Sequence, residues 1–309
     1  MISLEKVLSP QNMLLACKRV RANKGAPGVD GMTVDELEGH FRRHWASICA
    51  HIREGRYIPS LVKRVDIPKP DGSTRMLGIP TVQDRLIQQA IAQVLVEHFD
   101  PRFSEFSYGF RPGRSAHQAI EQTQRYIAEG RSWIVEMDLA KFFDTVNHDR
   151  LISVLERNCR DKMLIRLIRR YLRTSILADG LVTPRDEGTQ GSPLSPILSL
   201  IVLDELDKYL EKRGLKFCRY ADDCNYTLGP SAPGSACWKT RSSSSRSRSS
   251  CGLIATRAAS FALEEQKCKK PEPLRSTVGT RPHPTQERSE RKGGAVRMRA
   301  SYRVPLFSK

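Results

Sequence analysis

The chain has 309 residues, with 51 Lys or Arg and 34 Asp or Glu, so its formal net charge is +17. Mean hydropathy is −0.45, and no apolar run approaches the roughly 18 residues of a membrane span, which excludes a membrane-spanning class and predicts a cytoplasmic protein. The eight cysteines form no C-x-x-C pair and accompany no histidine cluster, which argues against a zinc site or a disulfide framework and favours reduced thiols.

The first 60 residues have the pattern of a helical segment. Residues 4–22 show helical apolar spacing, and the acidic and basic residues among them argue against a secretory signal. The turn residues of "GAPGVDGMT" predict a loop. Thr33 is then expected to cap a helix running toward Glu54, with Glu36 as its capping-box partner. We therefore predict an N-terminal helical extension over residues 1–60.

Residues 61–132 combine a hairpin with two helices. In "LVKRVDIPKPDGSTRMLGIP" apolar and polar residues alternate around Pro-Asp-Gly, which predicts a β-hairpin. Helical spacing returns over residues 82–99, and Ser115 is expected to cap a further helix that ends near Gly130. Between these helices, "FSYGFRPGRSAHQ" predicts a loop rich in glycine, arginine and aromatic residues.

In residues 133–229, two short apolar strands flank a helical region. One strand covers residues 133–137 and ends at Asp138, and "LKFCRY" leads into Asp222 and Asp223. Two helices are predicted between the strands, over 149–158 and 161–173. A Gly/Ser/Pro loop then leads into a long helix from about Ser195.

The aspartates at these strand ends define a candidate metal site. Asp222 and Asp223 alone do not decide the matter, since aspartates are also common in simple hairpin turns. Asp138 supplies a third carboxylate, and the helix-rich segment between the two strands allows them to lie side by side in one sheet. Three carboxylates at adjacent strand ends can hold two Mg²⁺ ions. Two such ions, about 3.5–4 Å apart, stabilise phosphoryl transfer, so the sequence predicts a nucleotide polymerase.

Five sequence blocks, in this order, resemble bacterial group II intron-encoded reverse transcriptase/maturases: "IPKPDGSTRMLGIPTVQDRLIQQAI", "FSEFSYGFRPGRSAHQAI", "VEMDLAKFFDTVNHDRL", "QGSPLSPILS" and "RYADD". The resemblance covers roughly residues 11–225. It implies an α+β right-hand polymerase, with fingers over 61–132 and an incomplete palm over 133–229 whose antiparallel sheet carries the site. It also implies an RNA-directed DNA polymerase that uses two Mg²⁺ ions and deoxynucleoside triphosphates, with Asp138, Asp222 and Asp223 as the metal carboxylates.

The same resemblance implies nucleotide-binding residues. Lys69 and Arg75 match fingers residues that grip the incoming triphosphate, although residue type alone would make them solvated hairpin charges. Phe143 stands where the family has the aromatic residue that excludes a ribose 2′-hydroxyl, although a core phenylalanine is the simpler alternative. Gln190 and Gly191 match the loop that lies against the templating base pair.

An RNA template, a DNA primer and group II intron RNA are the implied partners, and no membrane is implied. Arg111 and Arg114 of "GFRPGRS" are expected to contact template or backbone phosphate, although an arginine in a loop is more often simply solvated. The basic residues of the N-terminal extension are expected to hold intron RNA: Lys18, Arg19, Arg21 and Lys24. The alternative function is therefore an intron RNA-binding maturase, a splicing factor or an inactive RNA-binding remnant. Retron-type polymerases are a further alternative.

The chain departs from the family pattern in two places. Where the family reads "GTPQG", residues 188–192 read "GTQGS", one proline fewer. After Asn225 the family's palm helix, primer grip, thumb and maturase region are not recognisable. Residues 224–309 contain 17 Lys or Arg, five Glu and no Asp. Their Arg/Ser-rich composition predicts a disordered basic tail over 230–309.

A frameshift near Asn225 is the hypothesis that explains this change. We predict that the frame one nucleotide earlier is open beyond that codon and encodes helical palm and thumb sequence. The competing hypothesis is a genuine Arg/Ser-rich tail that binds RNA through its phosphates. Sequencing the gene across codons 220–260 separates the two, since stop codons in that frame would make the basic tail the real terminus. Without a thumb the chain is expected to be poorly active or inactive, and processive cDNA synthesis by these 309 residues would contradict that expectation.

Overall fold

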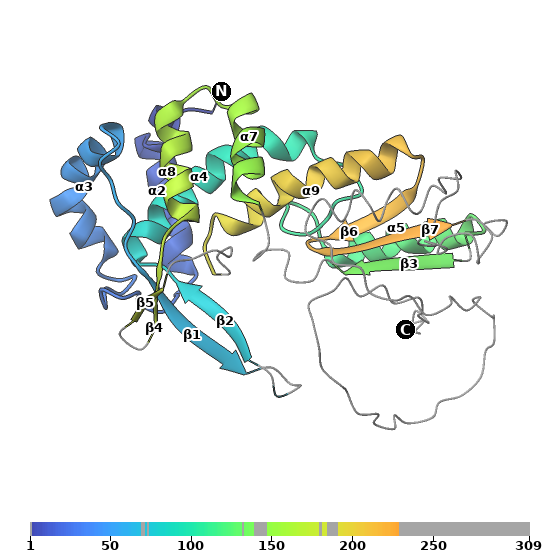
Figure 1. Cartoon of the computed structure of the whole chain (residues 1–309), viewed down its shortest axis with the longest axis horizontal. Helices are drawn as coiled ribbons and strands as arrows, with labels where there is room; N and C mark the ends of the chain where they lie inside the picture. Colours follow the sequence, from blue (N-terminus) through green and yellow to red (C-terminus); the bar gives the residue numbers. More distant parts are fainter. Residues whose placement is uncertain are drawn as a thin grey trace, which may run out of the picture. The chain divides into compact units, whose positions relative to one another are not determined.

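The computed structural model describes residues 2–68, 72, 74–131, 133–138, 147–178, 181–183 and 191–228, so the predicted tail at 230–309 lies outside the described residues. The helices in Figure 1 are α1 (Leu4–Val7), α2 (Pro10–Ala22), α3 (Leu37–Arg53), α4 (Val82–Phe99), α5 (Ala116–Ala128), α7 (His148–Asn158), α8 (Lys162–Leu172), α9 (Ser195–Lys212) and the 3-10 helix η1 (Asp100–Arg102). The strands are β1 (Val62–Pro68), β2 (Thr74–Ile79), β3 (Trp133–Asp138), β4 (Ile176–Ala178), β5 (Leu181–Thr183), β6 (Lys216–Tyr220) and β7 (Asp223–Leu228). No described helix is long and apolar enough to cross a membrane.

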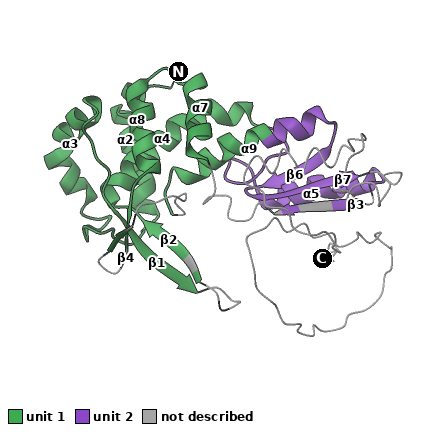
Figure 2. Ribbon diagram, in the orientation of Figure 1, with its two compact units in different colours: residues 1–103, 143–205 green, residues 104–142, 206–309 purple. Residues whose placement is uncertain are grey.

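The chain forms two compact units, which Figure 2 colours separately. Unit 1 comprises residues 1–103 and 143–205, and unit 2 comprises residues 104–142 and 206–309, so the boundary falls inside α9. The segments predicted from the sequence, 1–60, 61–132 and 133–229, follow the chain and do not coincide with these interleaved units. Their boundaries stay predictions.

Helix α4 is the central element of unit 1. It is buried on nearly all sides, as expected of an interior helix, and Thr81 caps it by accepting a hydrogen bond from the Asp84 backbone N–H. Helices α1 and α2 pack against it. The predicted helix over 82–99 is therefore confirmed.

The N-terminal helices differ from the prediction in two details. The single helix predicted over residues 4–22 is wrong, because the chain breaks between α1 and α2, where Pro10 takes the first helical position and has no N–H to continue α1. Helix α3 begins only at Leu37. Thr33 and Glu36 nevertheless pair as expected, since the Thr33 backbone N–H donates to Glu36 Oε2 at 2.7 Å.

Unit 1 contains a four-stranded sheet in the order β2-β1-β4-β5. Strands β1 and β2 form the predicted antiparallel hairpin, in which Ile67 lies opposite Arg75. Strand β4 joins β1 in parallel and pairs with β5. This second hairpin was not predicted, since three-residue strands are too short to show a clear alternation.

Unit 2 is built on a three-stranded antiparallel sheet in the order β3-β7-β6. Cys218 belongs to a buried cluster with Ala119 and Tyr126 of α5, so α5 covers one face. Arg219, the next residue of β6, points to the other face and pairs with Asp207 of α9. The predicted fold class, α+β with an antiparallel sheet, is confirmed.

Candidate functional site

The β6–β7 hairpin brings the predicted aspartates to one end of the sheet in unit 2. Asp222 lies in the turn between Tyr220 and Asp223, which are opposite each other. Strand β3 pairs with the other side of β7 and places Asp138 opposite Asp223. Directly opposed residues have Cα atoms about 4.5–5.5 Å apart and side chains on the same face. The two predicted strands, β3 and β6, share one sheet as expected, but they are not adjacent because β7 lies between them. Asp138 is described by its backbone alone.

The two faces of the sheet differ sharply at this end. Asp223 is exposed, and its neighbour across the hairpin, Tyr220, is 41% exposed. On the opposite face, Arg219 and Cys224 lie across from each other and are fully buried. Burial raises the pKa of the Cys224 thiol, so the thiol is neutral and adds no charge beneath the carboxylates.

The turn that carries Asp222 is tight and closely packed. Ala221 has φ +59°, a left-handed conformation that residues other than glycine rarely adopt. Gly109 packs against it so closely that an added Cβ would lie 2.1 Å from the Ala221 backbone nitrogen and 2.9 Å from the Tyr220 carbonyl carbon. Only a glycine permits this approach of two backbones.

A Gly109→Ala substitution is expected to displace the aspartate turn. The added methyl meets backbone atoms, which cannot rotate away, so we expect a loss of about 2 kcal/mol in the free energy of unfolding together with reduced divalent-ion binding. Urea unfolding and Mn²⁺ titration measure the two effects. Gly39→Ala is the matched control, since nothing lies within 4 Å of its added Cβ. Wild-type stability and Mn²⁺ affinity in Gly109→Ala would show that the turn tolerates the methyl group.

The segment that carries Gly109 also extends the sheet. The Arg219 backbone N–H donates to the Phe106 carbonyl at 2.9 Å, and the Tyr108 N–H donates to the Arg219 carbonyl at 2.8 Å. Ser107 thereby forms a parallel bridge with Arg219 at the outer edge of β6. Both backbone hydrogen-bonding groups of Arg219 are therefore bound to this segment, while Cys224 of β7 lies opposite its other side.

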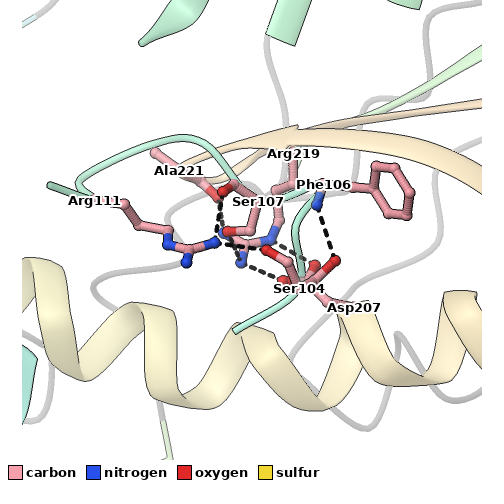
Figure 3. Close-up of polar contacts among 7 residues, drawn as sticks. All are labelled: Ser104, Phe106, Ser107, Arg111, Asp207, Arg219 and Ala221. Atoms are coloured by element: carbon pink, nitrogen blue, oxygen red, sulfur yellow. Dashed lines mark hydrogen bonds and ion pairs between the residues drawn. The ribbon is translucent and has the colours of Figure 1, made fainter. Parts of the chain in front are cut away.

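The Arg219 guanidinium lies at the centre of a buried polar network (Figure 3). Its Nε donates to Asp207 Oδ1 at 2.7 Å, and its Nη2 donates to Asp207 Oδ2 at 2.5 Å. The same Nη2 donates to Ser107 Oγ at 2.7 Å, and Nη1 donates to the Ala221 carbonyl at 2.8 Å. The side chains of Arg219 and Asp207 are both 0% exposed.

The two arginines of "GFRPGRS" are held by the loop in which they lie. Arg111 Nη1 donates to the carbonyls of Ser104, at 2.6 Å, and Ser107, at 2.9 Å (Figure 3). Arg114 Nη1 donates to the Glu105 carbonyl at 3.1 Å, and its guanidinium lies over a tyrosine ring in the same loop. Both arginines thus stabilise this loop, and their contact with nucleic acid stays a prediction.

The predicted nucleotide-binding residues all belong to unit 1. Three of them lie outside the described residues: Lys69, Phe143 and Gln190. Arg75 is described by its backbone, which lies in β2. Gly191 has φ +103°, and a Cβ on it would lie 2.3 Å from the carbonyl oxygen of Gly78, also in β2. Gly191 therefore lies against the strand that carries Arg75.

The basic residues predicted to hold RNA lie on or just after α2. Lys18, Arg19, Arg21 and Lys24 are all exposed. Arg19 donates to Gln93 at 3.1 Å, and Arg21 forms a loose ion pair of 3.5 Å with Glu38. Exposed contacts of this kind are weak, so the cationic groups stay accessible to phosphate.

A second buried polar network, in unit 1, was not predicted. Asp84, at the start of α4, is 1% exposed and accepts hydrogen bonds from the hydroxyls of Tyr57 (2.6 Å), Thr81 (2.8 Å) and Tyr171 (3.1 Å) and from the Ser60 backbone N–H (3.0 Å). Burial raises the pKa of this carboxyl, and the four hydrogen bonds act against that rise. The network joins α4 to α8 and to the segment before β1.

The aspartate turn has the donor chemistry of a divalent-cation site. Carboxylate oxygens are the ligands that Mg²⁺ prefers, and adjacent carboxylates repel unless a cation or a proton joins them. Among the side chains that the structure describes, no group of three His, Cys, Asp or Glu could hold a metal ion. A metal site with three carboxylates at this turn therefore requires Asp138 in addition to Asp222 and Asp223. The backbone of Asp138 lies opposite Asp223. Coordination by all three stays a prediction.

Sequence reasoning missed Arg219 and Asp207, although both left a signal. Arg219 stands in the strand "KFCRY", and Asp207 lies in the helix "SPILSLIVLDELDKYL", so each is a charge among mostly apolar residues. Almost fully buried charges in proteins are nearly always paired. A pairing between these two charges was therefore open to prediction.

The region that carries the three aspartates is also the region that matches known proteins. The protein family described as "Reverse transcriptase (RNA-dependent DNA polymerase)" matches residues 67–239, more than half of the chain. Protein YkfC of Escherichia coli (strain K12) is 34% identical over 220 residues, which cover 69% of this chain and 58% of YkfC. Group II intron-encoded protein LtrA of Lactococcus lactis subsp. cremoris is 34% identical over 215 residues, which cover 69% of this chain and 36% of LtrA.

Among solved structures, a chain of the "Partial Cas6-RT-Cas1--Cas2 complex" aligns with a TM-score of 0.48 and 24% identity, over 75% of this chain and 39% of that chain. The chain thus spans less than two thirds of the length of each of these relatives.

Proposed function

The chain belongs to the reverse transcriptase family, among the group II intron-encoded proteins, and on this basis we propose that it is an RNA-directed DNA polymerase that works by two-metal nucleotidyl transfer. The observation that carries the proposal is the meeting of Asp138, Asp222 and Asp223 at one end of an antiparallel sheet. Because the chain spans 58% of YkfC and 36% of LtrA, the activity of such longer proteins enters here as a proposal.

The three aspartates would hold the divalent ions. When bound, Mg²⁺ ions would stabilise the negative charge on the attacking and leaving oxygens of the primer and the triphosphate. The protein's part is to fix the carboxylates in advance: Asp138 and Asp223 through strand pairing, and Asp222 through a tight turn. Asp223 is exposed, so phosphate oxygens can reach its carboxylate.

The nucleotide contacts proposed for unit 1 extend this function. Lys69 and Arg75 would bind the triphosphate, Phe143 would exclude a ribose 2′-hydroxyl, and Gln190 and Gly191 would lie against the templating base pair. Support comes from Gly191, whose backbone lies against the strand that carries Arg75. The missing side chain of Gly191 is what allows β2 to approach its backbone so closely.

RNA binding is proposed for two basic sets. Lys18, Arg19, Arg21 and Lys24 would contact phosphates of intron RNA, and Arg111 and Arg114 would contact the template. The first set is exposed, and the ion pair between Arg21 and Glu38 is weak. Contacts of this kind release counterions, so RNA affinity should fall steeply as salt concentration rises. Splicing activity itself has no further support in the structure.

The test is single-nucleotide extension of a DNA primer annealed to an RNA template, with the full chain in excess over primer so that a weak, distributive activity is detected. We expect Mg²⁺-dependent addition of the complementary deoxynucleotide, with little addition of the ribonucleotide. Omitting the template is the control for terminal addition. Incorporation that ignores the template base, or no incorporation with Mg²⁺ or Mn²⁺, would overturn the proposal.

A further inference from the structure

The clearest unassigned feature of unit 2 is the Arg219 guanidinium, which lies on the face of the sheet opposite Asp223. We propose that Arg219 is a positioning residue that fixes the backbone of the aspartate turn and so sets the affinity of the carboxylates for divalent ions. The inference rests on the proposed polymerase function. It assigns Arg219 no contact with substrate, because the side chain is 0% exposed.

The hydrogen bond to the turn gives Arg219 this role. Arg219 Nη1 donates to the Ala221 carbonyl at 2.8 Å, and that carbonyl belongs to the peptide bond that joins Ala221 to Asp222. A peptide unit is planar, so fixing its oxygen also fixes the direction in which the Asp222 backbone leaves the turn. The orientation of the Asp222 side chain therefore depends on a donor two residues earlier in the chain.

The turn needs such a restraint because its conformation is unfavourable. Ala221 has a positive φ, which persists only where the surroundings hold it in place. Gly109 presses on the turn from the side of the Ala221 nitrogen, and Arg219 holds its carbonyl. Without the guanidinium, the turn can relax toward ordinary backbone angles.

Asp207 holds the guanidinium in this orientation. Its carboxylate accepts two hydrogen bonds from Arg219, a geometry that fixes the plane of the guanidinium, and Ser107 Oγ accepts a third. The pair carries no net charge, so the donor beneath the turn does not repel cations bound above it. A lysine could neutralise Asp207, but its single ammonium lacks the planar fork that reaches Asp207, Ser107 and Ala221 together.

The stability of the fold does not by itself require the buried ion pair between Arg219 and Asp207. Replacing a buried pair by apolar residues of similar size is often neutral or stabilising, whereas removing one partner leaves an uncompensated charge. This difference provides a clean variant: Arg219→Met combined with Asp207→Leu keeps the volume filled and removes only the polar contacts. Arg219→Lys is the second variant, and Arg213→Lys, at an exposed site just after α9, is the control.

The experiment measures Mn²⁺ binding to the full chain by electron paramagnetic resonance, with circular dichroism and thermal unfolding to verify folding. We expect the double variant and Arg219→Lys to bind Mn²⁺ about tenfold more weakly than wild type, near the low end of what outer contacts of a metal site contribute. Arg213→Lys should bind as wild type does. Single-nucleotide extension should fall in parallel and recover partly at high Mn²⁺ concentration, which a purely structural role would not produce.

The outcomes separate the two proposals. If wild type binds Mn²⁺ no better than Asp222→Ala, the metal site and this inference both fall. If wild type exceeds Asp222→Ala but the folded double variant binds as wild type does, the metal site stands and the positioning role is overturned. Should the double variant not fold, Arg219→Lys decides by the same comparison, because it keeps the buried charge balanced.

Discussion

Replacing Asp222 by alanine is expected to lower the rate of nucleotide incorporation by roughly a thousandfold. The variant removes a carboxylate that we propose to hold the metal ions, whose charge stabilisation is worth several kcal/mol, and each 1.36 kcal/mol corresponds to a factor of ten. RNA affinity should be unchanged, because the variant removes none of the basic residues proposed to bind RNA. Single-nucleotide extension and filter binding measure the two quantities.

The matched control is Asp35→Ala, which removes an exposed carboxylate from unit 1. It should leave both incorporation and RNA binding as in wild type. Incorporation by Asp222→Ala within tenfold of wild type would exclude Asp222 as a metal ligand. A parallel loss of RNA binding would point instead to a general loss of structure, which circular dichroism would detect.

Replacing Asp84 by alanine is expected to lower the free energy of unfolding by about 3–5 kcal/mol. The change leaves the hydroxyls of Tyr57, Thr81 and Tyr171 and the Ser60 N–H without their acceptor, and each such buried group costs about 1–3 kcal/mol before relaxation. Urea unfolding of the full chain gives the measurement. Tyr171→Phe, which removes a single donor, should cost only about 1 kcal/mol. Equal losses in the two variants would mean that the network does not converge on Asp84.

The buried carboxyl of Asp84 predicts that the free energy of unfolding depends on pH. Burial raises the pKa of Asp84 in the folded chain, whereas in the unfolded chain the pKa is about 4. Between these two values the folded state binds more protons than the unfolded state. The free energy of unfolding therefore falls as pH rises through this window. Asp84→Asn does not titrate, so the stability of wild type minus that of the variant should decrease as pH rises above about 4. A difference that stays flat or increases would contradict the raised pKa.

Helices that carry their own start and stop signals were predictable from the sequence. Ser115 and Gln118 form a full capping box at the start of α5, and α4 occupies the whole predicted range 82–99. The pairing of β1 with β2 was predictable from the alternation of apolar and polar residues around Pro-Asp-Gly in the sequence. These features depend on neighbouring residues, so a local pattern is sufficient to find them.

Features that depend on residues far apart in the chain were harder to predict from the sequence. The aspartates were found because each stands at the end of a recognisable strand, but the support beneath them joins Arg219 to Asp207 and Ser107, which lie in other elements. The acceptor role of Asp84 likewise needs Tyr171, 87 residues away. The sequence shows that such polar residues stand among apolar ones, and only the packed structure shows which of them meet.

The strand order β3-β7-β6 has a consequence for how the protein is made. Among the described strands, β3 pairs only with β7, and the second segment of unit 1, residues 143–205, is translated between them. At ordinary rates of about 5–20 residues per second, β3 waits roughly 4–20 s on the ribosome with its edge unpaired. An unpaired edge invites association with other chains, so chaperone capture in this interval should favour correct folding. The aspartate end of the sheet is therefore among the last parts of the described chain to be completed.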